Sequence, residues 1–388
     1  MLVRHVNIVG KQDLKDILIR EDKIQAVYAT ANGADEKDKL SLSFTHAMAF
    51  PGLINSHDHL DFNLFPPLGN KIYRNYTEWG KDIHTANKEA IDRILRIPQD
   101  LRTQWGIYKN LINGITTVIN HGKYLPVKDD LITVFQNSKS LHSPAFERNW
   151  KWKINFPFGK KHPVVIHVGE GTDKNAGREI DRLIRWNLFK RKIVAIHGVA
   201  MTKKQASAFR ALIWCPASNY FLLNKTAPVH TLTSQVAVML GTDSTLTASW
   251  NFWEHLRLAR SEKTLSDESI LNMIGNIPAK TWGLEHCGSL SEGGQADLVI
   301  ASCKKEMKAM DQFYALNPED LLLVLHKGNI RLFDAVLLEQ LVAGDFPVAG
   351  FSRISVNGRV KYVEGDLPGL MQNIRKYYPE VQFPVSAS

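Results

Sequence analysis

The segment Pro51–Leu60 constrains the fold of this 388-residue chain more than any other stretch. A Pro-Gly pair opens it, an apolar run suited to a buried strand follows, and His57 and His59 lie one residue apart near its end. Side chains at i and i+2 of an extended strand point to the same face, so these two imidazoles would aim at one point. A single strand can hold two metal ligands in this way. On its own the pair is weak evidence, because most such pairs are ordinary surface or core histidines.

The composition indicates a soluble globular protein with room for one large domain or two ordinary ones, since 44% of its residues are hydrophobic and 22% are charged. No apolar run approaches the roughly eighteen residues of a membrane span, and the N-terminus lacks the features of a secretory signal. We therefore expect a cytoplasmic protein without a membrane partner. The three cysteines are far apart and odd in number, which argues against a disulfide framework and against a Cys-x-x-Cys zinc site.

The net charge of +9 raises the question of a nucleic-acid partner. The basic residues are spread along the chain, and one of the densest groups, residues 182–192, falls on a predicted amphipathic helix. A solvated helix face explains such a group better than a binding surface. We therefore expect a small-molecule substrate and no nucleic acid, and homo-oligomerisation is left open.

Residues 51–286 alternate strand-like apolar runs with stretches of helical length, such as Lys88–Gly106, Gly177–Phe189, Lys203–Arg210 and Glu268–Leu284. The predicted strands are Gly52–Asn55, Thr116–Asn120, Ile132–Gln136, Val164–His167, Val194–His197, Ala211–Cys215 and Val236–Gly241. Alternating strands and helices indicate parallel strands joined by crossovers. Seven or eight such units predict an α/β fold of the TIM-like (β/α)₈ barrel type.

The two chain ends have a different character, because both consist of short strands separated by polar turns. We predict one composite β domain built from residues 1–50 and 287–388, which flanks the barrel of residues 51–286.

Polar side chains follow three further predicted strands. His167 ends one of them, with Glu170 three residues later, His197 ends another, and Asp243 follows the last. The C-terminal ends of all parallel strands in a barrel gather on one face, where active sites form. These residues would therefore converge with the first histidine pair. Each has a structural alternative, such as helix capping by Asp243, but their joint occurrence favours a metal site.

A set of motifs appears in chain order at Pro51–Leu60, Gly114–Val118, His167–Glu170, His197-Gly198, Cys215–Asn219, Leu240–Ser244 and Gly288–Val299. With these motifs the chain resembles the amidohydrolase superfamily, and within it the branch of cytosine deaminases, guanine deaminases and chlorohydrolases. The resemblance implies a barrel with a small composite β-sandwich domain from both termini. It covers nearly the whole chain.

The resemblance also implies a mononuclear metal site. Binuclear members place a carboxylated lysine at the end of strand four, and we find no such residue, whereas the His-x-x-Glu pattern resembles the mononuclear deaminases. The implied ligands of one divalent metal are His57, His59, His167 and Asp243. Zinc suits this set best, with iron as the alternative, and the metal would lower the pKa of a bound water toward about 7.

The same resemblance implies three catalytic residues. His197 would orient the water and stabilise the transition state, and Asp243 would accept the water's proton in addition to contacting the metal. Glu170 would be the proton shuttle, which protonates a ring nitrogen and then helps the amine to leave.

The region between Asn120 and Val164 departs from the family pattern because it is short. We predict strand three at Ile132–Gln136 and strand four at Trp150–Phe156, with one barrel unit degenerate or without its helix.

Substrate contacts are predicted from the segments that follow the strands. Residues 66–84 would arch over the site and offer Glu78 and Trp79 to a ring-shaped substrate. His121 and Asn219 follow other strands and are further candidates. For each of them, simple packing is the alternative.

These residues favour a hydrolase that removes an exocyclic amine from a nitrogen heterocycle and releases ammonia. The same attack could cleave a cyclic amide or amidine C–N bond or a C–Cl bond, and the glutamate does not distinguish these reactions. A non-catalytic binding protein is disfavoured, because every predicted ligand and Glu170 are present. The unrelated zinc deaminase fold is excluded, since it needs a Pro-Cys-x-x-Cys pair and Cys215 has no such partner.

Overall fold

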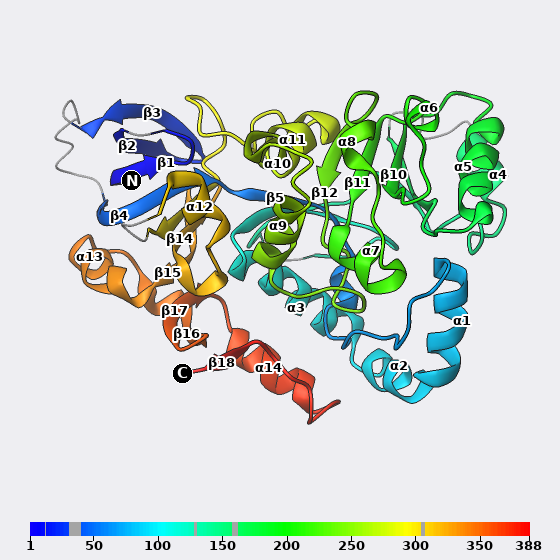
Figure 1. The fold of residues 1–388 in the computed structure, drawn as a ribbon. Helices are drawn as coiled ribbons and strands as arrows, with labels where there is room; N and C mark the ends of the chain where they lie inside the picture. Colours follow the sequence, from blue (N-terminus) through cyan, green and yellow to red (C-terminus); the bar gives the residue numbers. More distant parts are fainter. Residues whose placement is uncertain (12, 31–39, 128–129, 157–161, 304–306) are drawn as a thin grey trace.

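The computed structural model describes residues 1–11, 13–30, 40–127, 130–156, 162–303 and 307–388. Figure 1 shows two regions: strands from both chain ends (blue and orange to red) lie on one side, and the strands and helices of the intervening chain (cyan to yellow) lie on the other. Within the described residues, no helix has both the length and the apolar character that crossing a membrane requires.

The terminal region is a ten-stranded sheet with the order β18-β16-β17-β15-β14-β13-β4-β1-β2-β3. Its strands are β1 (Leu2–Ile8), β2 (Leu14–Arg20), β3 (Lys23–Ala29), β4 (Ser41–Pro51), β13 (Leu298–Ser302), β14 (Leu321–His326), β15 (Asn329–Asp334), β16 (Phe351–Val356), β17 (Arg359–Glu364) and β18 (Val385–Ala387). Strand β4 joins the two halves, because it pairs parallel with β1 and antiparallel with β13. Both chain ends therefore share one sheet, while the exact domain boundaries stay a prediction.

The intervening chain forms two parallel sheets, of order β12-β11-β10-β9-β8 and β5-β6-β7. The strands are β5 (Leu53–Asp58), β6 (Ile115–Asn120), β7 (Thr133–Phe135), β8 (Lys139–Leu141), β9 (Val164–Val168), β10 (Ile193–His197), β11 (Ala211–Trp214) and β12 (Ala237–Leu240). Every residue of β5, β6, β9 and β10 is buried. Continuous apolar runs of this kind are typical of parallel strands that are covered on both faces.

Backbone hydrogen bonds bring the two parallel sheets together at one point. The amides of Thr242 and Asp243, just after β12, both donate to the carbonyl of His57 on β5, over 3.1 and 3.0 Å. The edge strands β5 and β12 therefore meet at their C-terminal ends.

Helices surround these strands (Figure 1). They are α1 (Tyr76–Ala86), α2 (Lys88–Leu95), α3 (Gln99–Ile112), α4 (Trp150–Asn155), α5 (Lys174–Trp186), α6 (Lys203–Ala206), α7 (Pro216–Leu223), α8 (Val229–Leu232), α9 (Phe252–Ser261), α10 (Asp267–Met273) and α11 (Asn276–Trp282). Three more, α12 (Ala309–Tyr314), α13 (Leu338–Ala343) and α14 (Leu367–Arg375), follow β13, β15 and β17. Helix α3 is buried at every residue of Arg102–Ile112 except Gln104, and it connects to β6.

The predicted fourth strand is wrong. Residues 150–155 form helix α4, with Trp150 and Ile154 buried one turn apart and Trp152 63% exposed. The alternating apolar and lysine residues fit a strand, but the i, i+4 pair equally fits one helix face, and tertiary packing selects the helix. The strand at this place is β8, which follows β7 after only residues 136–138, so no helix separates these two strands.

Two predicted helices are each divided. Lys88–Gly106 becomes α2 and α3, which break at Pro98, because proline disfavours helical backbone in the residue before it. Glu268–Leu284 becomes α10 and α11, which break at Gly275. Pro278 lies in the first turn of α11, where proline is tolerated, and is therefore not the point of the break.

Candidate metal centre and active-site cavity

The ends of four parallel strands place the predicted metal and catalytic residues. His57 lies at the end of β5 and His59 just beyond it, His167 lies near the end of β9, and His197 is the last residue of β10. Asp243 follows β12. His197 and Asp243 have φ values of 70° and 60°, in the left-handed region that such residues rarely adopt. Strained backbone of this kind clusters at functional sites, where the surrounding structure holds it.

The side chains of these residues point at one small volume. The Nε2 atoms of His57 and His167 are 3.3 Å apart. Asp243 Oδ1 lies 3.6 Å from Nε2 of both His57 and His59. Two sets, His57 with His59 and His167, and His57 with His197 and Asp243, each have their ligating atoms within 4.8 Å of one another.

The donor atoms fit a divalent metal. His167 Nδ1 lies 2.7 Å from the carbonyl oxygen of His142 and donates to it, so the lone pair of a neutral His167 is on Nε2, facing His57. A backbone carbonyl that orients a histidine is the usual support of a metal ligand. Imidazole nitrogens with one carboxylate oxygen are ligands that zinc prefers.

Burial keeps these histidines neutral. It lowers the pKa of His59 to about 4 and the pKa of His197 to about 3, and it lowers the pKa of His167 well below its usual value. Neighbouring imidazoles act in the same direction on all three. Near neutral pH each ring therefore keeps a lone pair.

The two carboxyl groups have opposite shifts. Burial raises the pKa of Glu170 well above its usual value, and nearby Asp243 and Glu179 add to this. Burial also acts upward on Asp243, but His57 and the other histidines around it lower its pKa well below the usual value. The shift of the Glu170 pKa favours its protonated form, and the shift of the Asp243 pKa favours its ionised form. Two carboxyl groups whose pKa values are pushed apart suit an acid and a base.

Neutral donors support the ionised form of Asp243. Ser218 Oγ and Thr247 Oγ1 donate to its Oδ2 over 2.8 and 3.2 Å, and the amide of Ser244 donates to Oδ1 over 3.0 Å. Hydrogen bonds to a carboxylate stabilise its charged form.

A cavity of about 1160 Å³ lies against this cluster. Its wall includes His59, His121, His167, Glu170, His197 and Asp243. The remainder is lined both by apolar side chains, which include Phe62, Phe65, Trp79, Ile83, Ile91, Leu95, Phe146, Leu222 and Leu246, and by polar ones, which include Asp61, Arg102, His142 and Glu147. A cavity of this size, in which polar groups converge beside apolar and aromatic side chains, is typical of a small-molecule site.

The four predicted substrate residues lie in different surroundings. Trp79 lines the cavity, and its indole N–H donates to the carbonyl of Leu68 over 2.7 Å. His121 also lines the cavity, and its Nε2 is buried without a hydrogen-bond partner among the described residues. Glu78 is not part of the wall; it pairs with Arg74 over 3.1 Å.

Asn219, the fourth candidate, is fully buried. Its amide nitrogen lies 2.8 Å from Nδ1 of His197, so it contacts a predicted catalytic residue from behind. Contact with substrate remains a prediction for all four residues.

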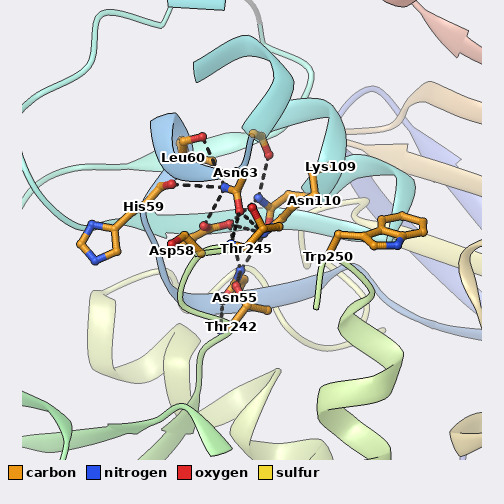
Figure 2. Close-up of polar contacts among 12 residues, drawn as sticks. Asn55, Asp58, His59, Leu60, Asn63, Lys109, Asn110, Thr242, Thr245 and Trp250 are labelled. Carbon is orange, nitrogen blue, oxygen red and sulfur yellow. Dashed lines mark hydrogen bonds and ion pairs between the residues drawn. The ribbon is translucent and has the colours of Figure 1, made fainter. Parts of the chain in front are cut away.

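Sequence reasoning missed a buried polar network behind the metal cluster (Figure 2). Asp58 Oδ2 accepts from Lys109 Nζ and Asn110 Nδ2, both over 2.8 Å, and Oδ1 accepts from Asn63 Nδ2 over 2.9 Å. Asp58 faces this network, whereas the ring of His59 projects away from it. The only sequence signal is the aspartate between the two histidines, because nothing marks Lys109 as buried.

The network also reaches the segment after β12. Asn55 donates to Asn110 Oδ1 over 3.1 Å and to Thr242 Oγ1 over 2.8 Å, and it accepts from the amide of Thr242 over 3.1 Å. Asn55 therefore connects β5 by hydrogen bonds to helix α3 and to the residue before Asp243.

Comparisons with known proteins agree with this architecture. A model of the amidohydrolase family matches residues 160–331. The 5-methylthioadenosine/S-adenosylhomocysteine deaminase of Pyrococcus horikoshii is 23% identical over 91% of both chains. The protein of the same name from Carboxydothermus hydrogenoformans is 22% identical over 74% of this chain and 79% of its own.

Solved structures share the fold. A zinc-bound adenosine deaminase from Xanthomonas campestris superposes with a TM-score of 0.70 at 17% identity, over 98% of both chains. The zinc complex of atrazine chlorohydrolase from Arthrobacter aurescens has a TM-score of 0.67 at 16% identity, over 89% of this chain and 99% of its own. Together these matches show that the chain is similar to the amidohydrolase family over residues 160–331, and that it shares its fold with structures named as a deaminase and a chlorohydrolase.

Proposed function

We propose that this protein is a metal-dependent hydrolase that removes an exocyclic amine from a purine-like nitrogen heterocycle and releases ammonia. The observation that carries the proposal is the placement of Glu170 and Asp243, whose pKa values are shifted in opposite directions, beside the histidine cluster on the wall of a large cavity. The names of the sequence relatives support a purine-like substrate, since they are deaminases of adenosine derivatives. The substrate is thus a small molecule.

The metal ligands in this proposal are His57, His59, His167 and Asp243, and zinc is the metal. The carbonyl that holds His167 and the mutual proximity of the ligating atoms support this set. A divalent metal at this point would lower the pKa of a water molecule and so supply a nucleophile near neutral pH.

The chain's own residues move the protons. Asp243 takes a proton from the attacking water, whose oxygen forms a bond to the amine-bearing carbon. Glu170 gives its proton to the adjacent ring nitrogen, which neutralises the charge that the attack creates there. Asp243 then passes its proton to the amino group, the C–N bond breaks, and ammonia leaves. The remaining hydroxyl proton returns to Glu170 as the carbonyl forms.

The position of His197 suits a hydrogen-bonding role in this reaction. Its Nε2 lies 3.6 Å from Glu170 Oε2 and 3.9 Å from Asp243 Oδ2, between the proposed acid and base. A hydrogen bond from this atom to the attacking oxygen would orient it and stabilise the charge that develops on it.

We infer further that the eight parallel strands close into a (β/α)₈ barrel over residues 51–286. The hydrogen bonds from the amides just after β12 to the carbonyl of His57 on β5 support closure on that side. The unit between β7 and β8 then lacks its helix. Residues 1–50 and 287–388 form the flanking β-sandwich domain in this arrangement.

An ammonia-release screen tests the function. Zinc-loaded protein is offered 6-aminopurine nucleosides, free purines, pyrimidines, pterins and triazines, and ammonia is measured. We expect release from at least one 6-aminopurine compound, with the corresponding oxopurine as product.

The same screen includes chlorinated triazines and cyclic amides. The similarity to a chlorohydrolase structure makes C–Cl hydrolysis the second candidate. Chloride release or ring opening without ammonia from any amine would replace the deaminase proposal.

A further inference from the structure

A chain of buried hydrogen bonds ends at His197. The amide nitrogen of Asn219, on α7, lies 2.8 Å from His197 Nδ1. Thr226 Oγ1 donates to Asn219 Oδ1 over 3.3 Å. Trp214 Nε1 donates to Thr226 Oγ1 over 2.6 Å. The chain therefore runs from the last residue of β11, through the loop after α7, to the last residue of β10.

The indole of Trp214 fixes which group donates and which accepts in each hydrogen bond of this series. An indole N–H only donates, so the oxygen of Thr226 accepts from Trp214. The Thr226 hydroxyl still has its own hydrogen, and the amide oxygen of Asn219 is the acceptor within reach. With its oxygen turned to Thr226, Asn219 turns its NH₂ group to His197. Nδ1 of His197 must then be the acceptor, without a hydrogen.

A neutral imidazole with a bare Nδ1 carries its hydrogen on Nε2. That atom of His197 is buried and has no hydrogen-bond partner among the described residues. A protonated Nε2 has no lone pair to give to a metal, but it can donate a hydrogen bond.

His167 shows the opposite arrangement. Its Nδ1 donates to a carbonyl, which leaves the lone pair on Nε2. The rings of His167 and His197 stack with centroids 5.2 Å apart, yet their surroundings favour different tautomers. The partner of Nδ1 therefore favours a hydrogen on Nδ1 in His167 and a hydrogen on Nε2 in His197.

We propose that Asn219 is a positioning residue, which holds His197 in the tautomer with hydrogen on Nε2 and so keeps it off the metal as a hydrogen-bond donor to the attacking oxygen. The tautomer follows from the hydrogen-bond chain alone. The role toward the attacking oxygen rests on the proposed function.

Nitrogen NMR reads the tautomer directly. Protein labelled with ¹⁵N-histidine and loaded with zinc gives long-range ¹H–¹⁵N correlations for each ring, and the His197→Gln variant identifies the signals of His197. We expect a protonated Nε2 and a bare Nδ1. A wild-type His197 with hydrogen on Nδ1 would overturn the proposal.

The Asn219→Asp variant reverses the donor at nearly constant shape, because a carboxylate only accepts. We expect hydrogen to appear on Nδ1 of His197. We also expect kcat to fall about 10- to 100-fold, the usual effect of losing such a supporting contact, with KM little changed. A reversed tautomer with full kcat would show that Asn219 does not position His197 for the reaction.

Two further variants serve as a substitute for Asn219→Asp and as a control. Thr226→Val removes the hydroxyl that orients Asn219. If Asn219→Asp fails to fold, NMR of this variant tests the same tautomer. We expect its kcat to fall by less than about tenfold. Tyr220→Phe is the matched control on α7, since the Tyr220 hydroxyl donates to Glu262, and we expect no change in tautomer or kcat. If no compound releases ammonia, the proposed function is wrong. The NMR result still determines the tautomer of His197 in that case.

Discussion

The short stretch at the end of β5 separates two buried polar regions with opposite properties. On one side lies the cavity cluster, which we define as His57, His59, His167, Glu170, His197 and Asp243. On the other lies the Asp58 network, which consists of Asn55, Asp58, Asn63, Lys109, Asn110 and Thr242 (Figure 2). Asp58 belongs to the second region although both of its neighbours in sequence belong to the first.

The two regions differ in how fully their polar atoms are bonded. In the cavity cluster, His57 Nδ1 and His197 Nε2 are buried and have no hydrogen-bond partner among the described residues. In the Asp58 network, both carboxylate oxygens of Asp58 and the Lys109 ammonium are bonded. A buried polar atom without a partner is costly, and His197 Nε2 faces Glu170 and Asp243, where a ligand could supply that partner. The bonded network marks the part that holds the site in shape.

Glu170→Gln gives the largest expected effect, and it tests the cavity cluster. Glutamine keeps the shape but has no acidic proton, so we expect kcat to fall roughly 10²- to 10⁴-fold, the usual contribution of a general acid. Steady-state kinetics and elemental analysis of bound zinc check this prediction. Metal content should stay at the wild-type level. Full turnover in this variant would remove Glu170 from the mechanism.

Lys109→Met tests the Asp58 network. The variant leaves a buried carboxylate without its cation, so we expect the free energy of unfolding to fall by about 3–5 kcal/mol. Urea denaturation of the metal-free protein measures it.

Two controls accompany this prediction. Adding Asp58→Asn to Lys109→Met removes the unpaired charge and should recover part of the loss. Lys88→Met breaks an exposed ion pair with Asp92 and should leave the urea midpoint nearly unchanged, because such pairs contribute little. Equal losses from Lys109→Met and Lys88→Met would show that the network does not hold the site.

Acid should destabilise the metal-free protein through the neutral histidines of the cavity cluster. His197 has a folded pKa of about 3 and an unfolded pKa of about 6.5, so stability is complete above pH 6.5 and falls as pH decreases toward 3. At pH 5 the loss from this one group is about 2 kcal/mol. Glu170 has a raised pKa and acts in the opposite direction, because acid favours its folded, protonated form.

The contribution of His197 is therefore measured as a difference. Between pH 7 and pH 5, His197→Gln should lose about 2 kcal/mol less stability than wild type. Urea denaturation at both pH values, with chelator present, gives the two losses. Identical losses would mean that His197 is not held neutral by burial.

Trp79→Phe carries the smallest expected effect and tests the cavity wall. The change removes one hydrogen bond to Leu68, so we expect a stability loss of about 1 kcal/mol and a KM increase of a few-fold, with kcat unchanged. Glu78→Gln is the matched change beside it, and it should leave KM unaltered because Glu78 does not line the cavity. The reverse pattern would return Glu78 to the substrate site.

The comparison also explains which parts of the structure could be predicted from the sequence. The convergence of His57, His167 and Asp243 follows from two general rules, strand alternation and the gathering of strand ends, so a single sequence suffices. The shared terminal sheet follows from its turns and short strands.

Other parts depend on tertiary packing that a local pattern does not specify. Residues 150–155 satisfy both a strand and a helix pattern, and only their neighbours select the helix. In the sequence Lys109 looks like an ordinary polar residue of a helix. Its burial depends on Asp58, which lies 51 residues away in sequence. The cavity wall comes from loops and helix ends, where no periodicity identifies the side chains that face inward.

The position of β4 has a consequence for how the protein is made. Its edge against β13 stays open until the ribosome has completed the chain from Pro51 to Leu298, which takes on the order of ten to fifty seconds at about 5–20 residues per second. During this time β1 and β4 can already pair, and the open edge of β4 presents unpaired backbone groups. Chaperone dependence during synthesis should therefore be greatest before β13 emerges, and a circular permutant that makes β13 directly before β4 should reduce it.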